Sequence, residues 1–128
     1  MTKFKVILDT NFLMLPHQHG VDIFSEINRL VSEDYDLLIP GKVADELVSI
    51  SEKSAGIDGI SARVALQLIR KKNINTVEYD KNVDDSIVDF VNNHADCIVC
   101  TNDKNLKRKI KNKAQLISMR GKDHLIRI

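Results

Sequence analysis

The sequence contains no apolar run that approaches the roughly 20 residues of a membrane-spanning helix. Its first apolar run, residues 4–8, stops at Asp9, so no signal peptide is expected either. Cysteine is scarce, with Cys97 and Cys100 both in one expected strand. Residues three apart in a strand point to opposite faces and do not chelate one ion together. We therefore expect two buried, reduced cysteines in a cytoplasmic protein that has no membrane partner.

Internal repeats, low-complexity tracts and linkers are also absent. Residues 1–128 are expected to form a single domain, because this length is sufficient to bury a core. The sequence has no glycine-rich dinucleotide motif, no P-loop and no GxSxG motif. Their absence excludes the nucleotide-binding and serine-hydrolase classes that depend on them.

Short β-rich runs alternate with longer segments of helical periodicity. The expected strands are Phe4–Leu8, Asp36–Ile39, Ile74–Tyr79, Asp96–Thr101 and Gln115–Met119. Apolar residues at helical spacing lie between them: Val21, Phe24, Ile27, Leu30 and Val31; Val43, Leu47 and Ile50; Val64 and Leu68; Ile87, Val88, Val91 and Ala95; Leu106 and Ile110. The alternation predicts an α/β fold, a three-layer α/β/α sandwich with a mainly parallel central sheet.

One segment, Ser51–Ser61, breaks the helical pattern with small residues and two glycines. A plain connection between two helices is the favoured interpretation. The alternative is a flexible loop near a substrate cleft.

Acidic residues stand where strands give way to loops or helices. Asp9 ends the first strand, Asp103 follows the fourth, and Asp84 and Asp85 open an apolar helix. Because the carboxyl ends of parallel strands lie at one edge, Asp9, Asp85 and Asp103 are expected to face a common pocket. Carboxylates are costly to crowd together unless a cation neutralises them. Oxygen ligands suit Mg²⁺ or Mn²⁺, the ions that most often serve phosphodiester hydrolysis.

Helix capping is the alternative explanation for several of these acids. Asp84 or Asp85, and likewise Asp103, stand where an N-cap residue accepts backbone hydrogen bonds. Asp9 precedes only a short expected turn, Asn11–Leu15. A charged residue directly after a buried strand needs a partner, so a functional role is favoured at Asp9.

Glu46 lies within an expected helix, at the border of the apolar stripe formed by Val43, Leu47 and Ile50. Asp45 projects away from that stripe. Glu46 therefore joins the candidate cluster, and Asp45 is interpreted as a solvated charge.

Charge is unevenly distributed along the chain. Residues 1–103 carry 17 acidic residues against 10 Lys or Arg, whereas residues 104–128 carry 9 Lys or Arg against one acid. Lys104, Lys107, Arg108 and Lys111 recur at helical spacing, which predicts one basic helix face starting directly after Asp103. A solvated face is the ordinary interpretation of such a run. Its position next to Asp103 favours binding of nucleic-acid phosphates.

Four segments of the chain resemble PIN-domain nucleases: Val-Ile-Leu-Asp-Thr-Asn at 6–11, Val-Ala-Asp-Glu-Leu at 43–47, Asp-Asp-Ser-Ile-Val at 84–88, and Ile-Val-Cys-Thr-Asn-Asp-Lys-Asn-Leu-Lys at 98–107. They extend over almost the whole chain. The chain is most similar to the branch that contains the eukaryotic small-subunit processome nuclease and archaeal VapC-like ribonucleases. The resemblance implies a metal-dependent endoribonuclease, acting either as a VapC-like toxin or in ribosomal RNA processing.

The resemblance also implies roles for individual residues. The family's acidic quartet, catalytic and metal-binding, corresponds to Asp9, Glu46, Asp85 and Asp103, with Asp84 as the alternative to Asp85. Two polar residues that orient the site correspond to Asn11 and Thr101. The implied cofactor is Mg²⁺ or Mn²⁺. The implied partners are RNA and either an antitoxin or ribosome-assembly proteins, and a homodimer is a further assembly left open.

Two other functions compete with this one. A phosphatase of the haloacid-dehalogenase type also has an aspartate after its first strand, but it needs a second aspartate where this chain has Asn11. The non-enzymatic alternative is an RNA-binding or ribosome-assembly factor whose acidic pocket only holds an ion.

Overall fold

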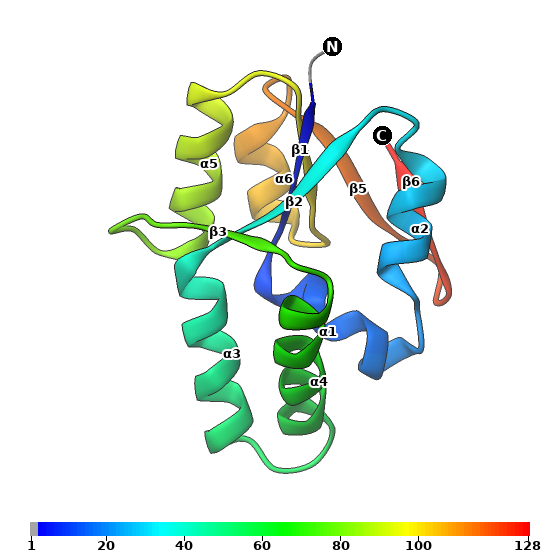
Figure 1. Ribbon diagram of the computed structural model, residues 1–128, viewed down its shortest axis with the longest axis vertical. Coiled ribbons are helices and arrows are strands. Elements are labelled where there is room, and N and C mark those ends of the chain that lie inside the picture. The colour runs from blue at the N-terminus through cyan, green and yellow to red at the C-terminus, as the bar shows by residue number, and fades with distance from the viewer. Residues whose placement is uncertain (1–2) are drawn as a thin grey trace.

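Strand β1 (Phe4–Leu8) lies at the centre of the sheet in the computed structural model, which describes residues 3–128 (Figure 1). The other strands in this part of the chain are β2 (Tyr35–Pro40), β3 (Asn75–Val77), β4 (Cys97–Cys100), β5 (Gln115–Arg120) and β6 (His124–Arg127). Their order across the sheet is β3-β2-β1-β4-β5-β6. Neighbouring strands are parallel except for β6, which pairs antiparallel with β5.

Helices cover the sheet and extend beyond the carboxyl ends of its strands. They are α1 (Thr10–His19), α2 (Ile23–Leu30), α3 (Gly41–Lys53), α4 (Ile57–Lys71), α5 (Val83–Asn93) and α6 (Lys104–Ile110). The pair α3 and α4 reaches past the sheet, and α1 packs against α4, whereas α5 packs against α6 and α2 against β6 (Figure 1). The predicted α/β/α sandwich with a mainly parallel sheet is confirmed. Within residues 3–128, no helix has the length and apolar character needed to cross a membrane.

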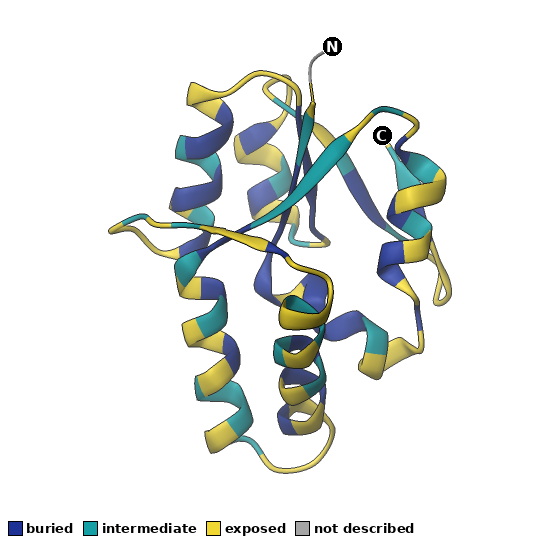
Figure 2. Cartoon of the chain, in the orientation of Figure 1, coloured by how far each residue is buried: buried dark blue, intermediate teal, exposed yellow. Residues whose placement is uncertain are grey.

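The two central strands have almost uninterrupted apolar sequences. Val6, Ile7 and Leu8 of β1 are buried, and so is the whole of β4, Cys97 to Cys100 (Figure 2). Parallel strands that are covered on both faces have such runs in place of alternating residues. Both cysteines are free thiols in the core, which confirms the expectation of a buried-strand role.

Helix α1 corrects the expectation of a short turn over Asn11–Leu15, because ten residues are helical. Asp9 caps its first turn, and Gly20, at φ 65°, ends it in the left-handed conformation. Pro16 lies inside the helix, where it lacks the amide hydrogen that would bond to the preceding turn. Because proline is unfavourable inside helices, its presence explains why the sequence pattern predicted only a short turn here.

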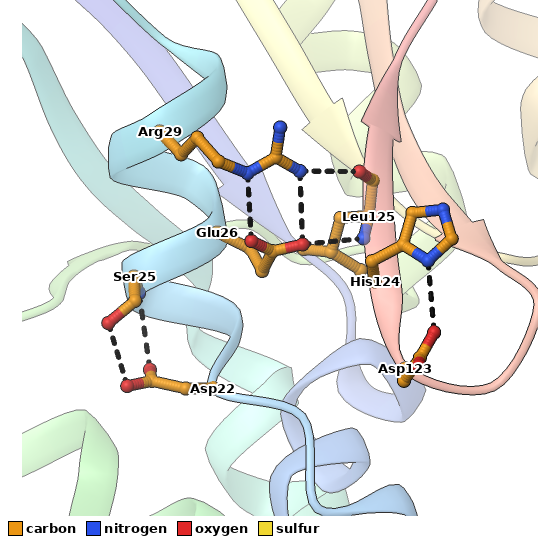
Figure 3. A network of polar contacts seen from close by, with 7 residues as sticks. All are labelled: Asp22, Ser25, Glu26, Arg29, Asp123, His124 and Leu125. Carbon is orange, nitrogen blue, oxygen red and sulfur yellow. Dashed lines mark hydrogen bonds and ion pairs between the residues drawn. The ribbon is translucent and has the colours of Figure 1, made fainter.

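The edge strand β6 was not expected either, and side chains of α2 cover its outer side. The Leu125 amide donates to Glu26 Oε1 at 2.9 Å, and the Arg29 guanidinium donates to the Leu125 carbonyl oxygen at 3.1 Å (Figure 3). The hydrogen bond from Arg29, followed by that from Leu125, lowers the pKa of Glu26 to about 2. Backbone groups that would otherwise pair with another chain are therefore satisfied within this one.

The segment Ser51–Ser61 is mostly helical, because α3 continues to Lys53 and α4 begins at Ile57. The favoured interpretation, a connection between two helices, is confirmed. Gly59 makes this connection tight: a Cβ atom there would lie 2.2 Å from the carbonyl oxygen of Ser54. A glycine is required where two backbones approach this closely.

We expect Gly59→Ala to destabilise the protein by about 1–3 kcal/mol, because the added methyl group forces the backbone at Ser54 to move. Helix propensity alone predicts the opposite sign, a gain of about 1 kcal/mol. Urea unfolding followed by circular dichroism distinguishes the two, with Gln67→Ala on the exposed side of α4 as the control. A stabilised Gly59→Ala protein would contradict the close approach.

Candidate functional site

A pocket of about 260 Å³ opens at the carboxyl ends of the central strands, with walls from α1, α3, α5 and α6. It is large enough for a cation together with several water molecules. Five carboxylates line it with one lysine and four uncharged residues: Asp9, Glu46, Asp84, Asp85, Asp103, Lys109, Thr10, Asn11, Asn82 and Val83. All acids selected from the sequence therefore meet in one place.

Asp9 is fixed at the junction between β1 and α1. Leu8 is in register with Cys100 of the neighbouring strand, so the next residues, Asp9 and Thr101, lie side by side. Asp9 Oδ1 accepts a hydrogen bond of 2.8 Å from the Phe12 amide, and Asp9 Oδ2 accepts one from the Thr101 hydroxyl. A carboxylate has about four acceptor positions, so these bonds leave it capacity for a further partner.

The charge on Asp9 is poorly accommodated despite these hydrogen bonds. Burial, with a smaller contribution from the nearby charges of Asp84 and Asp103, raises the pKa of its carboxyl from 3.8 to about 6, although the hydrogen bonds from Thr101 and Phe12 oppose the rise. Its side chain is 5 % exposed. A positive charge in the pocket would favour the ionised form.

Asp103 is held by the same polar chain of contacts. Its amide donates to the Thr101 hydroxyl oxygen at 3.0 Å, and that hydroxyl donates onward to Asp9. Asp103 Oδ1 caps α6 by accepting from the Asn105 and Leu106 amides at 2.8 and 3.1 Å. Both capping bonds use one oxygen, so capping and binding of another group by Oδ2 are compatible.

Asp84 and Asp85 do not cap α5. The cap is Asn82, whose side-chain oxygen accepts from the Asp85 amide at 2.8 Å, so the capping explanation for these two acids is wrong. Asp84 is half-buried and Asp85 is exposed. Burial raises the pKa of Asp84, and the charges of Asp103, Glu46 and Asp85 add to this, against Lys109. Asp84 is therefore the more buried acid of this pair, and its carboxyl is perturbed by the other acids of the cluster.

Glu46 reaches the pocket from the exposed side of α3. Its Oε1 accepts a hydrogen bond of 2.6 Å from the hydroxyl of Thr10, which is buried next to Asp9. Asn11 lines the same pocket. Asp45 is exposed and does not line the pocket, as the helical phase predicted.

The basic residues at helical spacing divide between α6 and its C-cap. Helix α6 ends at Ile110 and carries Lys104, Lys107 and Arg108, and Lys111 is the C-cap residue, with φ −54° and ψ 133°. A turn then leads to β5. The Arg108 guanidinium also donates to the Asn105 side chain. Lys109, which the helical spacing left out, is the lysine that lines the pocket.

The donor set fits a hard divalent cation in its chemistry, because carboxylate oxygens surround the pocket and one of them is buried with a raised pKa. Among residues 3–128, however, no three His, Cys, Asp or Glu side chains are already arranged as a metal site. A hard cation here would be held by one or two of these carboxylates with water as its other ligands, or by more of them after they move closer together.

Comparisons with known proteins find one matching family model and two similar ribonucleases. A family model described as "PIN like domain" matches residues 6–122. Ribonuclease VapC4 of Methanocaldococcus jannaschii is 31% identical over 110 residues, which cover 84% of this chain and 82% of that protein. Ribonuclease VapC9 of Archaeoglobus fulgidus is 30% identical over 105 residues, covering 82% of this chain and 74% of that protein.

Two further similarities extend over nearly the whole chain. The rRNA-processing protein fcf1 of Schizosaccharomyces pombe is 30% identical over 128 residues, covering 98% of this chain but 62% of that protein. The solved structure of the PIN domain endonuclease Utp24 superposes with a TM-score of 0.79 at 26% identity, covering 96% of this chain and 90% of that one.

The raised pKa of Asp9 predicts how stability depends on pH. The folded-state pKa of about 6 exceeds the ordinary 3.8, so folded protein binds the proton more tightly and loses stability as pH rises from about 4 to above 6. Ionised Asp9 then costs about 3 kcal/mol at pH 7. Without divalent ions, we expect Asp9→Asn to be more stable than wild type at pH 7.5, and this advantage to disappear near pH 3.5.

Urea unfolding in EDTA at the two pH values measures this difference. The asparagine keeps an acceptor for the Phe12 amide and is close in volume to aspartate, so the comparison isolates charge. A mutant less stable than wild type at pH 7.5 would mean that the lost hydrogen bond to Thr101 outweighs the removal of the charge.

Proposed function

The chain belongs to the PIN-like domain family, as its motifs indicated, and on that premise we propose that it is a metal-dependent endoribonuclease that hydrolyses phosphodiester bonds in RNA. One observation carries the proposal: four separate segments bring five carboxylates to one pocket at the carboxyl edge of a parallel sheet. Such crowding of like charges is unfavourable for stability alone. The pKa of Asp9 is raised mainly by burial, and the charges of Asp84 and Asp103 contribute to the rise. The crowding becomes useful when the pocket binds a cation.

The acids that would hold Mg²⁺ or Mn²⁺ are Asp9, Asp84, Asp103 and Glu46. Asp84 takes the place that sequence reasoning preferred for Asp85, because Asp84 is half-buried and coupled to the other acids. When bound, the ion would supply the positive charge that activates water and stabilises the phosphate oxygens.

The surrounding polar residues keep these acids in position. Thr101 orients Asp9 through its hydroxyl, and the Asp103 amide orients Thr101 in turn. Thr10 orients Glu46, and Asn11 lines the pocket as a further polar contact. In the overall reaction one water is consumed and one phosphorus–oxygen bond is replaced, giving a phosphate monoester and a hydroxyl. No protein nucleophile is needed for this hydrolysis.

The basic surface beside the pocket binds the flanking phosphates of the RNA. Lys104, Lys107 and Arg108 extend from α6 directly after Asp103, and Lys111 adds a charge just beyond the helix. Contacts of this kind give affinity and a salt dependence without sequence specificity.

Two biological roles follow from the named relatives. The two ribonucleases named VapC suggest a toxin with an antitoxin partner, and the fcf1 and Utp24 proteins suggest ribosomal RNA processing with ribosome-assembly proteins. The chain spans 82% and 74% of the two VapC ribonucleases, 62% of fcf1 and 90% of the solved Utp24 chain, and both roles are kept in the proposal. In either role, we propose that residues 1–128 act as one domain, with a homodimer as a further possible assembly. A non-catalytic RNA-binding factor with the same fold is the alternative function.

Single-turnover cleavage of a panel of structured RNAs in Mn²⁺ tests the proposal. We expect wild-type protein to cleave and Asp9→Asn to lose at least about a hundredfold in rate, because the charge that holds the ion is removed. Asp45→Asn, the same change at an exposed position on α3, should keep wild-type activity. Binding of RNA without cleavage by the wild type would favour the non-catalytic alternative.

The choice between Asp84 and Asp85 has its own test. We expect Asp84→Asn to reduce cleavage by at least about a hundredfold, and Asp85→Asn to reduce it by less than about tenfold, because Asp84 is half-buried among the other acids whereas Asp85 is exposed. The two variants remove the same charge from adjacent positions and are matched controls for each other. The reverse ranking would assign the ligand to Asp85.

A further inference from the structure

Lys109 is the one positively charged side chain that lines the acidic pocket in the part of the chain described. It belongs neither to the acidic cluster nor to the basic surface formed by Lys104, Lys107 and Arg108 on the same helix. Those three residues do not line the pocket. Lys109 therefore occupies the place where carboxylates and RNA phosphate would meet.

The geometry of α6 explains how a residue so far along the helix reaches this place. Lys109 follows the capping residue Asp103 by six positions, which is about 9 Å along a helix axis. Side chains in a helix tilt toward its N-terminus, so the long lysine side chain extends back toward the end that Asp103 occupies. Helix α6 packs against α5, which carries Asp84, another residue that lines the pocket.

In the described part of the chain, Lys109 also forms no ion pair with the carboxylates around it. Five acids share its pocket, yet none of the ion pairs within 4.0 Å among residues 3–128 includes Lys109. The positive charge of Lys109 still acts on Asp84 from beyond ion-pair distance, where it opposes the rise in the pKa of that carboxyl. An ammonium group near a carboxylate cluster but outside ion-pair contact is available to an anionic substrate.

We propose that Lys109 donates a hydrogen bond to a non-bridging oxygen of the phosphodiester that is being hydrolysed. This inference rests on the proposed function. Lys109 keeps its proton throughout: water supplies the oxygen that bonds to phosphorus, and the leaving oxygen departs with the electron pair of the broken bond and takes up the proton that the water loses. The lysine stabilises the negative charge that the phosphate oxygens carry in the transition state.

This role differs from that of the basic surface in what each contributes. Contacts to flanking phosphates strengthen RNA binding equally before and during the reaction, so their removal weakens the ground state and the transition state by the same amount. A contact to the reacting phosphate strengthens as charge redistributes, so it raises the rate even when RNA is saturating.

The test compares Lys109→Gln, Lys109→Arg and Lys113→Gln with the wild type. Lys113 is an exposed lysine beyond α6 that does not line the pocket, so its variant is matched in net charge. Single-turnover cleavage at saturating RNA is measured across a Mn²⁺ titration, and thermal melts in EDTA check that each variant is folded. We expect Lys109→Gln to lower the saturating rate by about tenfold to a hundredfold, with Lys109→Arg recovering most of it and Lys113→Gln unchanged.

The Mn²⁺ midpoint distinguishes this role from an effect on ion binding. A midpoint within about twofold of wild type, with the rate still low at the highest Mn²⁺, supports a contact to the substrate. Full recovery of Lys109→Gln at high Mn²⁺ would overturn it, because Lys109 would then only balance the charge of the acids. Wild-type cleavage with undiminished Lys109→Gln would remove the Lys109 role alone, whereas a wild type that cleaves none of the RNAs would remove the proposed function and this inference with it.

Discussion

The site depends on one constraint: a carboxylate, Asp9, stands at the end of the central strand with almost no exposure to solvent. It follows β1, caps α1 through Oδ1 and accepts from the Thr101 hydroxyl through Oδ2, and its remaining acceptor positions are left for a partner in the pocket. Capping fixes the entry of the chain into α1 and so fixes Thr10 and Asn11 on the pocket wall. Asp9 therefore has a structural role and a proposed chemical role at once. Helix capping does not compete with the proposed function at this residue.

The neighbouring strand supplies the support that makes this burial tolerable. Thr101 follows β4 as Asp9 follows β1, and the parallel register between these strands brings its hydroxyl to the carboxylate. The hydroxyl both donates to Asp9 and accepts from the Asp103 amide, so two acids on different elements are held through one side chain. The remaining electrostatic cost appears as the pKa of about 6 at Asp9. A site that is destabilised before its ligand binds gains the most from a cation.

The sequence predicted the strands of the core well, because burial on both faces leaves a continuous apolar signal in β1 and β4. It also placed the acids at the correct edge, since that follows from parallel topology. Where local signals conflicted, the predictions failed. Pro16 conceals α1, and helical spacing did not single out Lys109, the lysine that lines the pocket. For the acid pair, the sequence left Asp84 as an alternative to Asp85, because only the packing of α5 makes one half-buried and the other exposed.

Lys109 shows why basic residues at helical spacing do not by themselves predict which of them lines a site. Spacing groups the basic residues by helix face, whereas the direction of each side chain decides what it reaches. The residues that fit the expected face stay outside the pocket, and the one that did not fit lines it. Helix α6 thus carries two kinds of positive charge, one set outside the pocket and one lysine beside the carboxylates. Because Asp103 starts the same helix, its rigid turns fix the separation between an acid of the site and the lysine that would meet the reacting phosphate.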